Sequence, residues 1–289
     1  MKTYIVGSIN TDFVIECERL PKLGETVQGG NFLINAGGKG ANQAHACAKL
    51  GGVVKMCGRI GDDLYGERWR DSLKDSGVDV SHVKTAEGCM TGCAVITVFE
   101  GNNSIIIDSG ANSKITKEDI DSFLNDASKG DILLCQLENP IDIVGYALKC
   151  AHERGMTTVL NPAPANTEIA EYLKYVDIIT PNEHEVELMG GVEHLLSLGL
   201  KTVITTLGEN GYEIASRGFS KRYPCLKVTP VDTTAAGDTF CGGLCAKLSL
   251  GYDIEESCRF ASAAASISTT RYGASASIPT KDEVIKYLK

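Results

Sequence analysis

No apolar run in this sequence of 289 residues reaches the roughly 20 residues that a membrane-spanning helix requires. The opening residues MKTYIVGSIN lead directly into an apolar strand pattern and lack the features of a secretory signal. Lysine and arginine form no dense cluster, and the formal net charge is −9, so nucleic acid and anionic membranes are not expected partners. We therefore expect a cytoplasmic protein that binds any phosphorylated ligand with backbone amides, a few cations or a metal ion.

Signatures of zinc, P-loop and dinucleotide sites are also missing. The spacings Cys89/Cys93 and Cys241/Cys245 are not those of a zinc ribbon, and no nearby histidine completes a ligand set. Neither G-x-x-x-x-G-K-[ST] nor G-x-G-x-x-G occurs. Most of the 11 thiols are therefore expected to be small buried side chains in a reducing compartment.

Strand and helix patterns alternate through most of the chain. Apolar strand patterns are expected at 4–9, 53–61, 131–136, 157–161, 177–181 and 202–208. Between them lie helical patterns at 39–51, 63–77, 116–128 and 141–154. This alternation predicts an α/β fold, a doubly wound and mainly parallel sheet with helices on both faces.

Two segments, 13–35 and 90–107, break the alternation because they read as strands without an intervening helix. A hairpin turn is expected at Gly101-Asn102-Asn103. These segments predict a small antiparallel β lid that could cover a site, pair with another subunit, or do both. The remaining residues, 1–12, 36–89 and 108–289, would form the α/β domain.

The stretch VDTTAAGDTFCGG, residues 231–243, carries the most informative pattern. Small residues lead into a helix, where unpaired amides and the helix dipole create an anion site. Asp238 stands beside that site, and its charge would repel an anion. Either Asp238 is a general base for an attacking hydroxyl, or it is only a first-turn helix acid with Asp232 as a cap. The spacing alone does not choose between these interpretations.

Four more polar clusters fall near the ends of expected strands, where α/β proteins bind ligands. They are GSINTD with Asn10 and Asp12, GGKGANQA with Gly38, Lys39 and Asn42, QLENP with Glu138, and TPNEHE with Asn182 and Glu185. Each could be explained by a tight turn. Together they indicate one polar ligand site, and the last pair suits water-mediated magnesium contacts.

The motifs GSINTD, GETVQGG, GGKGANQA, GRIGDD, QLE, NPAPA, DIITPNEHE, TLGENG and VDTTAAGDTF occur in this order. In this respect the chain, from about residue 4 to 279, resembles the ribokinase-like (PfkB) carbohydrate kinases, and within them the ribokinases. The resemblance implies that Asp238 is the general base. It also implies that amides around Ala235, Ala236 and Gly237 stabilise the transferring phosphoryl group.

The resemblance further implies the ligand contacts. The sugar would lie against Asn10, Asp12, Gly38, Lys39, Asn42, Glu138 and Asp238. The nucleotide would lie against Asn182, Thr206, Leu207, Gly208, Glu209, Asn210, Gly211, Gly237 and Ser262. Magnesium would be held through water by Asn182 and Glu185. An activating potassium ion would be bound, largely by main-chain carbonyls, at Asp232, Thr234, Ser268, Arg271, Gly273 and Ser277.

The expected activity is therefore MgATP-dependent phosphorylation of D-ribose to ribose 5-phosphate by a homodimer that pairs through its β lid. A related kinase acting on deoxyribose, fructose or a nucleoside is the main alternative, because it would share the phosphate-side residues. A catalytically silent sugar-binding regulator is a second alternative. An oxidoreductase is disfavoured, since the dinucleotide fingerprint is absent.

Overall fold

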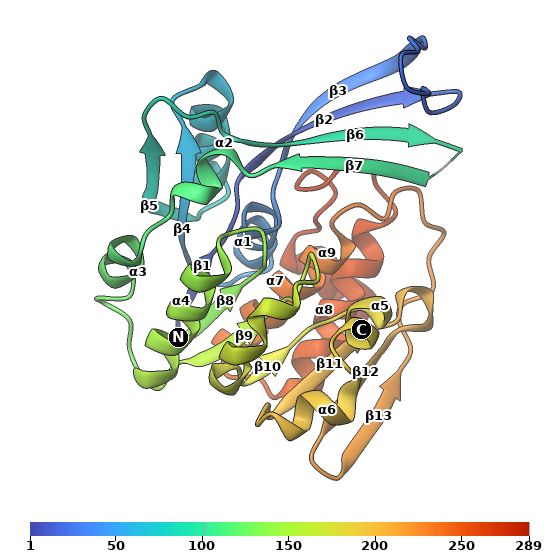
Figure 1. The fold of residues 1–289 in the computed structure, drawn as a ribbon. Coiled ribbons are helices and arrows are strands. Elements are labelled where there is room, and N and C mark those ends of the chain that lie inside the picture. Colours follow the sequence, from blue (N-terminus) through green and yellow to red (C-terminus); the bar gives the residue numbers. More distant parts are fainter. Residues whose placement is uncertain (101, 289) are drawn as a thin grey trace.

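Two β-sheets of unequal size organise the chain (Figure 1). In the computed structural model, which describes residues 1–100 and 102–288, the larger sheet has nine strands in the order β13-β12-β11-β10-β9-β8-β1-β4-β5. Their bounds are β1 Thr3–Val6, β4 Val54–Gly61, β5 Asp79–Ala86, β8 Ile132–Cys135, β9 Thr157–Leu160, β10 Ile178–Ile179, β11 Thr202–Thr206, β12 Tyr212–Ser216 and β13 Phe219–Tyr223. Only the β11–β12 and β12–β13 pairs are antiparallel.

Helices cover both faces of this sheet. One face packs against α1 (Lys39–Lys49), α2 (Leu64–Asp75), α7 (Ala236–Ser249), α8 (Ile254–Ser268) and α9 (Lys281–Leu288). The other packs against α3 (Lys117–Phe123), α4 (Ile141–Glu153), the 3₁₀ helix η2 (Thr167–Tyr175), α5 (Glu183–Leu188) and α6 (Val192–Ser197). Within β1, Ile5 faces the first layer, whereas Tyr4 and Val6 face the second. The expected doubly wound α/β fold is thus confirmed.

The expected helix at 116–128 is shorter than its pattern suggested. A capping box joins Thr116 and Asp119, whose side chains each bind the other's backbone N–H, and this starts α3. The helix ends at Phe123, and a turn from Leu124 to Ala127 follows. The other three helices predicted with bounds, at 39–51, 63–77 and 141–154, correspond to α1, α2 and α4 and begin and end within a few residues of those bounds.

The smaller sheet has the order β3-β2-β6-β7, with β2 Asn10–Cys17, β3 Gly29–Gly37, β6 Gly92–Phe99 and β7 Asn102–Asp108. Its two hairpins are antiparallel, and the central β2–β6 pair is parallel. The sheet extends as an arm beyond the main body (Figure 1). Of the expected hairpin turn, Gly101 lies outside the described residues, whereas Asn102 and Asn103 belong to β7.

One placement differs from the sequence prediction. Asn10 and Asp12 were expected at the end of the first strand of the main sheet, but β1 ends at Val6. Both residues lie in β2, at the base of the smaller sheet, because the chain crosses from one sheet to the other after a short loop. The Trp69 indole N–H of α2 donates to the Thr11 hydroxyl (2.9 Å) and attaches this base to the main body.

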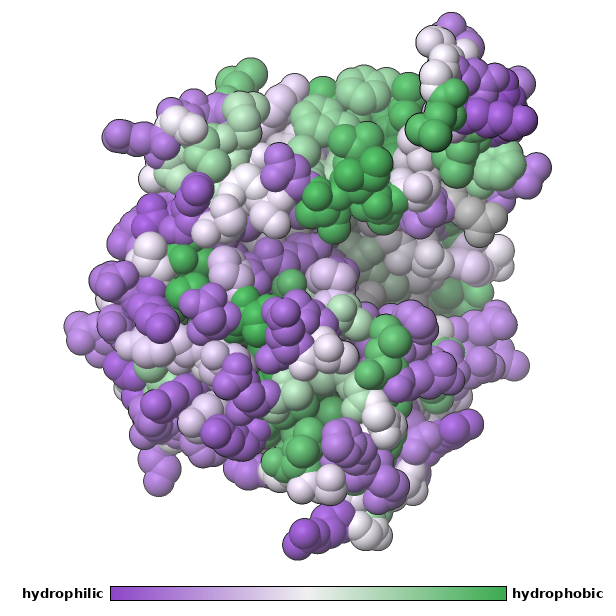
Figure 2. All heavy atoms as spheres, viewed as in Figure 1, coloured by the Kyte–Doolittle hydropathy of each residue, from purple (hydrophilic) through white to green (hydrophobic). Residues whose placement is uncertain are grey.

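The smaller sheet exposes apolar side chains on both of its faces, since consecutive residues of β3 and of β7 are exposed. Figure 2 shows hydrophobic side chains gathered over β6 and β7, and the exposed set across the sheet is Phe32, Leu33, Val95, Ile105, Ile106 and Ile107. Such a patch is typical of an interaction surface. Within the part of the chain that the structure describes, no helix has both the length and the apolar character needed to cross a membrane.

Candidate active site

A cavity of about 500 Å³ lies where β9, β10 and β11 end and where α1, α5 and α7 begin. Its lining residues are Lys39, Asn161, Ala163, Thr180, Asn182, Glu183, His184, Glu185, Thr206, Gly208, Thr233, Ala235, Ala236, Gly237, Asp238 and Cys241. Residues from five of the motifs singled out in the sequence therefore meet in one cavity. This is the position at which open α/β sheets bind ligands.

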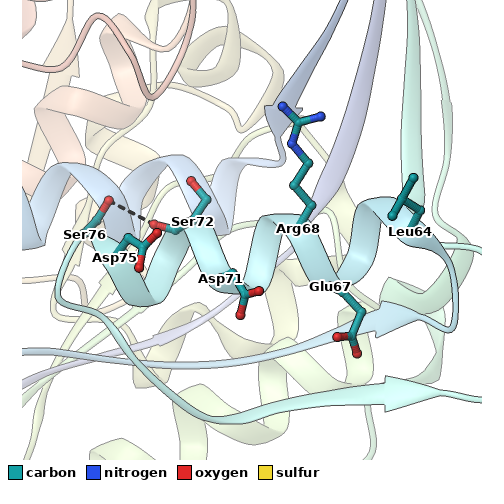
Figure 3. A pocket seen from close by; sticks show the side chains of 7 residues that line it. All are labelled: Leu64, Glu67, Arg68, Asp71, Ser72, Asp75 and Ser76. Carbon is teal, nitrogen blue, oxygen red and sulfur yellow. Dashed lines mark hydrogen bonds between the residues drawn. The ribbon is translucent and has the colours of Figure 1, made fainter.

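A larger cavity, about 660 Å³, runs along α2 and has a different character (Figure 3). Its lining residues are Leu64, Glu67, Arg68, Asp71, Ser72, Asp75 and Ser76, which all belong to α2 or its C-cap. Figure 3 shows that their side chains do not converge on a common point. No predicted site residue lines this groove, so we place the candidate site in the first cavity.

The N-terminus of α7 opens into the 500 Å³ cavity. Its cap residue, Ala235, has a left-handed backbone conformation (φ 58°) and provides no side-chain hydrogen bond to the helix. The Ala236 N–H donates to the Thr233 carbonyl (3.2 Å). Among the described residues, the Gly237 and Asp238 N–H groups have no such partner and stay available for an anion. A Cβ at Gly237 would meet no atom within 4 Å, so the space before the first turn is open.

Asp238, in the first turn of α7, is only 7% exposed. Its Oδ2 accepts a hydrogen bond from Asn42 Nδ2 (3.0 Å), and its Oδ1 accepts one from Gln43 Nε2 (2.9 Å). Burial raises the pKa of Asp238 above its ordinary value, although Lys39 and the two amides act in the opposite direction. The side chain is thus a buried, oriented carboxylate, and no ion pair with another described residue closes it off.

Lys39 lies among three carboxylates at the start of α1. Burial disfavours its charge, but Asp238, Glu138 and Glu185 outweigh that effect and raise the pKa of Lys39 above its ordinary value. Two hydrogen bonds hold Glu138 in place: its Oε2 accepts from the Ser8 hydroxyl and from the Lys39 backbone N–H (3.0 Å). The centre therefore contains a permanent cation between acidic groups.

Asn10 and Asp12 adjoin the same centre from β2. Gly38 takes φ 89°, and a Cβ there would lie 2.8 Å from the Asn10 backbone nitrogen, so glycine permits this close approach. Burial, with the neighbouring charges of Glu138 and Asp238, raises the pKa of Asp12 to about 7, and Lys39 partly opposes the rise. Asp12, Glu138 and Asp238 thus form one electrostatically coupled acidic group around Lys39.

Residues 2–281 match the pfkB family of carbohydrate kinases. The chain belongs to this family. It is accordingly an enzyme, a phosphotransferase, as the sequence motifs predicted. A ribokinase of Haemophilus influenzae is 40% identical, with 99% of this chain and 97% of that protein aligned. A deoxyribokinase of Salmonella typhimurium is 33% identical over 100% of this chain and 99% of that protein.

Solved structures of ribokinases share the fold. The ribokinase of Thermotoga maritima superposes with a TM-score of 0.91 at 38% identity, covering 100% of this chain and 99% of the other. The ribokinase of Arabidopsis thaliana, solved in complex with ribose and ATP, has a TM-score of 0.90 at 34% identity, covering 100% and 98%. The predicted family is therefore confirmed.

In this carbohydrate kinase, Asn182 and Glu185 form a capping box at the start of α5. Asn182 Oδ1 accepts from the Glu185 N–H and Glu185 Oε2 accepts from the Asn182 N–H, both at 2.8 Å. Both residues line the cavity, and among the described residues neither the Asn182 amide nitrogen nor Glu185 Oε1 has a hydrogen-bond partner. A carboxylate oxygen that faces the cavity suits a water of hydrated magnesium, which prefers oxygen partners.

The predicted nucleotide residues divide into two groups. Thr206 and Gly208 line the cavity, and Thr206 bridges Asn182 from the neighbouring strand. The turn around the 3₁₀ helix η3 (Gly208–Asn210) contains the other four, which do not line the cavity: Leu207, Glu209, Asn210 and Gly211. Ser262 is buried on α8 and does not line it either.

The residues predicted for potassium come from two loops that the structure brings together. Asp232 Oδ1 accepts from the Thr234 N–H (2.8 Å), and Oδ2 accepts from the Gly273 N–H (2.9 Å), 41 residues away. The Arg271 side chain points away, to Glu283 (2.6 Å). Both Asp232 oxygens thus hold the two loops together.

Several residues of the site were missed from the sequence. Asn112, in the 3₁₀ helix η1 (Gly110–Lys114), donates to Asn10 Oδ1 (2.7 Å). Gln43 binds Asp238, and Asn161 lines the cavity and binds Gln43 (3.1 Å). The motifs GGKGANQA and NPAPA contain Gln43 and Asn161, but nothing in either motif separates these amides from ordinary turn or helix residues.

Proposed function

We propose that this carbohydrate kinase transfers the γ-phosphoryl group of ATP to the 5-hydroxyl of D-ribose. One observation carries the proposal: the buried carboxylate of Asp238 opens into the same cavity as the free amides of α7 and the polar start of α5. Similarity to a ribokinase solved with ribose and ATP supports the choice of both substrates.

In the proposed reaction, Asp238 accepts the proton of the ribose hydroxyl as its oxygen attacks the γ-phosphorus in line. The amides around Ala235, Ala236 and Gly237 stabilise the charge on the transferring group. The bond from phosphorus to the leaving oxygen breaks, and ADP departs. Asn42 and Gln43 keep the carboxylate oriented, since each donates to one of its oxygens.

We assign ribose to the space bounded by Asn10, Asp12, Gly38, Lys39, Asn42 and Glu138. A carboxylate at Asp12 accepts hydrogen bonds from a vicinal diol, and Lys39 supplies donors. Asn10 Oδ1 is occupied by Asn112, so Asn10 presents its amide N–H groups to an acceptor on the sugar. Oxygen-rich ligands are favoured there, because unmatched buried polar groups are costly.

On the nucleotide side, Asn182 would donate to a phosphate, and Glu185 would hold magnesium through water. When bound, the metal ion would offset negative charge on the phosphates. Thr206, Leu207, Gly208, Glu209, Asn210 and Gly211 would surround the nucleotide, with Ser262 on its adenine side. A potassium ion would be bound by carbonyls of the loops at Asp232–Thr234 and Ser268–Ser277, which end beside α7.

We further propose that segments 13–35 and 90–107 act as a lid and as a homodimer contact. The exposed apolar side chains of the smaller sheet support pairing. Asn10 and Asp12, which we assign to the sugar, belong to β2, and this supports a link between lid position and sugar binding. Lid closure would exclude water, which otherwise competes as acceptor. Sedimentation equilibrium of the chain at increasing concentration tests the pairing.

The decisive experiment is a panel of acceptors compared by kcat/KM, with ADP release as the readout, in the presence and absence of potassium. D-Ribose should give the highest value. The similarity to a deoxyribokinase makes 2-deoxyribose the second candidate, and the panel includes fructose and a nucleoside. A clear preference for any of these rejects ribose, and absence of ADP release with every acceptor supports a silent sugar-binding protein.

A further inference from the structure

A chain of buried amides lies behind Asp238, and a backbone carbonyl fixes its polarity. The Thr180 carbonyl can only accept, so Asn161 must present its nitrogen there (2.9 Å). Asn161 therefore offers its oxygen to Gln43, whose nitrogen donates to it (3.1 Å). The Thr180 carbonyl cannot act as a donor, so through Asn161 it fixes the orientation of the Gln43 amide.

Gln43 is held at its other end as well. Its Oε1 accepts from Gln136 Nε2 (2.6 Å), and the second N–H of its Nε2 donates to Asp238 Oδ1 (2.9 Å). Gln43 is fully buried on α1, 195 residues from Asp238 in sequence. All three polar positions of the side chain are used, so it can offer Asp238 nothing except a donor.

The other carboxylate oxygen has a different neighbour. Asn42 Nδ2 donates to Asp238 Oδ2 (3.0 Å), but Asn42 Oδ1 is buried without a partner. Within residues 1–100 and 102–288, therefore, no hydrogen bond to Oδ1 fixes the direction of the Asn42 amide. The two oxygens of Asp238 are thus held unequally, Oδ1 by a locked donor and Oδ2 by an amide that retains a free acceptor.

We propose that Gln43 is a positioning residue that keeps Oδ1 of Asp238 as a permanent hydrogen-bond acceptor, so that the proton of the sugar hydroxyl is received at Oδ2. The inference rests on the proposed function, since it needs Asp238 as the base. A proton on Oδ1 would point at the fixed Gln43 amide N–H, donor against donor. A proton on Oδ2 can be accommodated, because the Asn42 amide can turn over and present its unpartnered oxygen as the acceptor.

The proton balance is complete without another reactant. The hydroxyl O–H bond breaks and the proton binds Oδ2 while the oxygen forms its bond to phosphorus. The bond to the leaving oxygen breaks, and ADP carries away that electron pair. After product release, Asp238 returns its proton to solvent. Gln43 exchanges no proton at any stage.

The test compares Gln43→Met with wild type by the pH dependence of kcat. Loss of the Gln43 hydrogen-bond donor destabilises the ionised carboxylate and so raises the pKa of Asp238. The acidic limb of the kcat profile should therefore move to higher pH by about one unit or more. At neutral pH kcat should fall on the order of tenfold, and KM for ribose should change less than about threefold. The ionisable groups that face Asp238, namely Lys39, Glu138, Asp12 and the neutral Cys241 thiol, stay in place in this variant.

Two further variants make the test decisive. Gln43→Glu keeps the chain length and the acceptor for Gln136 but places a like charge beside Asp238, so its acidic limb should move further in the same direction. Gln136→Met loosens Gln43 without touching Asp238 and should give a smaller shift of the same sign. Any of these three that folds serves as the test, and folding is verified by thermal unfolding and ribose binding.

An acidic limb that stays at the wild-type pH in the folded variants overturns the inference, because a merely structural Gln43 would lower stability only. Asp238→Asn distinguishes a failure of the role proposed for Gln43 from a failure of Asp238 as the base. If that change abolishes turnover while the Gln43 variants keep the wild-type profile, the inference alone fails. If Asp238→Asn retains turnover, the proposed base itself is wrong.

Discussion

The α carbon of Gly37 lies directly against the carboxylate of Asp12, and a Cβ added at Gly37 would overlap its three carboxylate atoms. The two residues occupy neighbouring strands, β3 and β2, at the base of the smaller sheet. Glycine at position 37 is therefore what leaves room for the Asp12 carboxylate, which we assign to the proposed sugar site. Glycine is needed there to leave space for the Asp12 side chain and not for its backbone conformation, because the φ of Gly37 lies outside the left-handed region.

Gly37→Ala is accordingly expected to displace Asp12 and raise KM for ribose roughly 10- to 100-fold, the loss of a hydrogen bond to a charged group, with a smaller change in kcat. Gly30→Ala is the matched control, because it lies on the same strand and a Cβ there meets no atom within 4 Å. Steady-state kinetics with ribose measure both. Equal KM values for the two variants would contradict the role of Asp12.

Asp238→Asn should lower turnover by about 10²- to 10⁴-fold and leave ribose binding nearly intact, because the amide cannot accept the hydroxyl proton. Single-turnover ADP release and calorimetric ribose binding measure the two properties separately. If Asp238 is only a first-turn helix acid, the substitution costs about 0.3–1 kcal/mol of stability and little turnover. Asp253→Asn, at the N-cap of α8, provides that comparison.

Ribose affinity should depend on pH through Asp12. Its pKa is raised to about 7, so in the ligand-free protein the carboxylate is largely ionised above pH 7 and protonated below it. Because the diol hydroxyls bind the ionised form, the dissociation constant should rise as pH falls through 7, approaching tenfold per unit. Calorimetry in buffers of different ionisation enthalpy should also detect proton release on binding near pH 6.

Asp12→Asn is the control for this titration. The amide has no charge to lose, so ribose binding by this variant should be weaker at pH 8 and nearly independent of pH between 6 and 8. A wild-type dissociation constant that stays constant over this range would show that Asp12 is ionised throughout. Glu138 and Asp238 face Asp12 and are retained in both proteins.

Asn112→Ala is expected to lower both stability and ribose affinity. Asn112 Oδ1 accepts from the Ile9 N–H (2.9 Å) and Nδ2 donates to the Ile9 carbonyl (3.2 Å), so removal leaves buried groups unpaired, at about 1–3 kcal/mol. It also frees Asn10 to rotate. Asn139→Ala is the control, because among the described residues the Asn139 side chain binds the Asn112 backbone carbonyl alone (3.2 Å). Thermal unfolding and KM for ribose measure the two effects.

The local pattern of residues determined the fold class, the anion site and the family of this protein. Alternating apolar and amphipathic segments predicted the doubly wound sheet, and small residues before α7 marked an anion site, because periodicity and helix-terminus chemistry are local properties. The capping box at Asn182 and Glu185 was also within reach, since both residues lie in one helical turn. The motif order identified the carbohydrate kinase family.

Only the tertiary structure decided how those parts meet. The sequence placed Asn10 and Asp12 at the end of a strand in the main sheet, whereas the crossover to β2 puts them at the base of the smaller one. It gave no sign that Gln43 would bind Asp238 or that Asn112 would orient Asn10, more than 100 residues away. A buried amide has no sequence signature of its own, because its partners depend on how separate elements pack and on strand register.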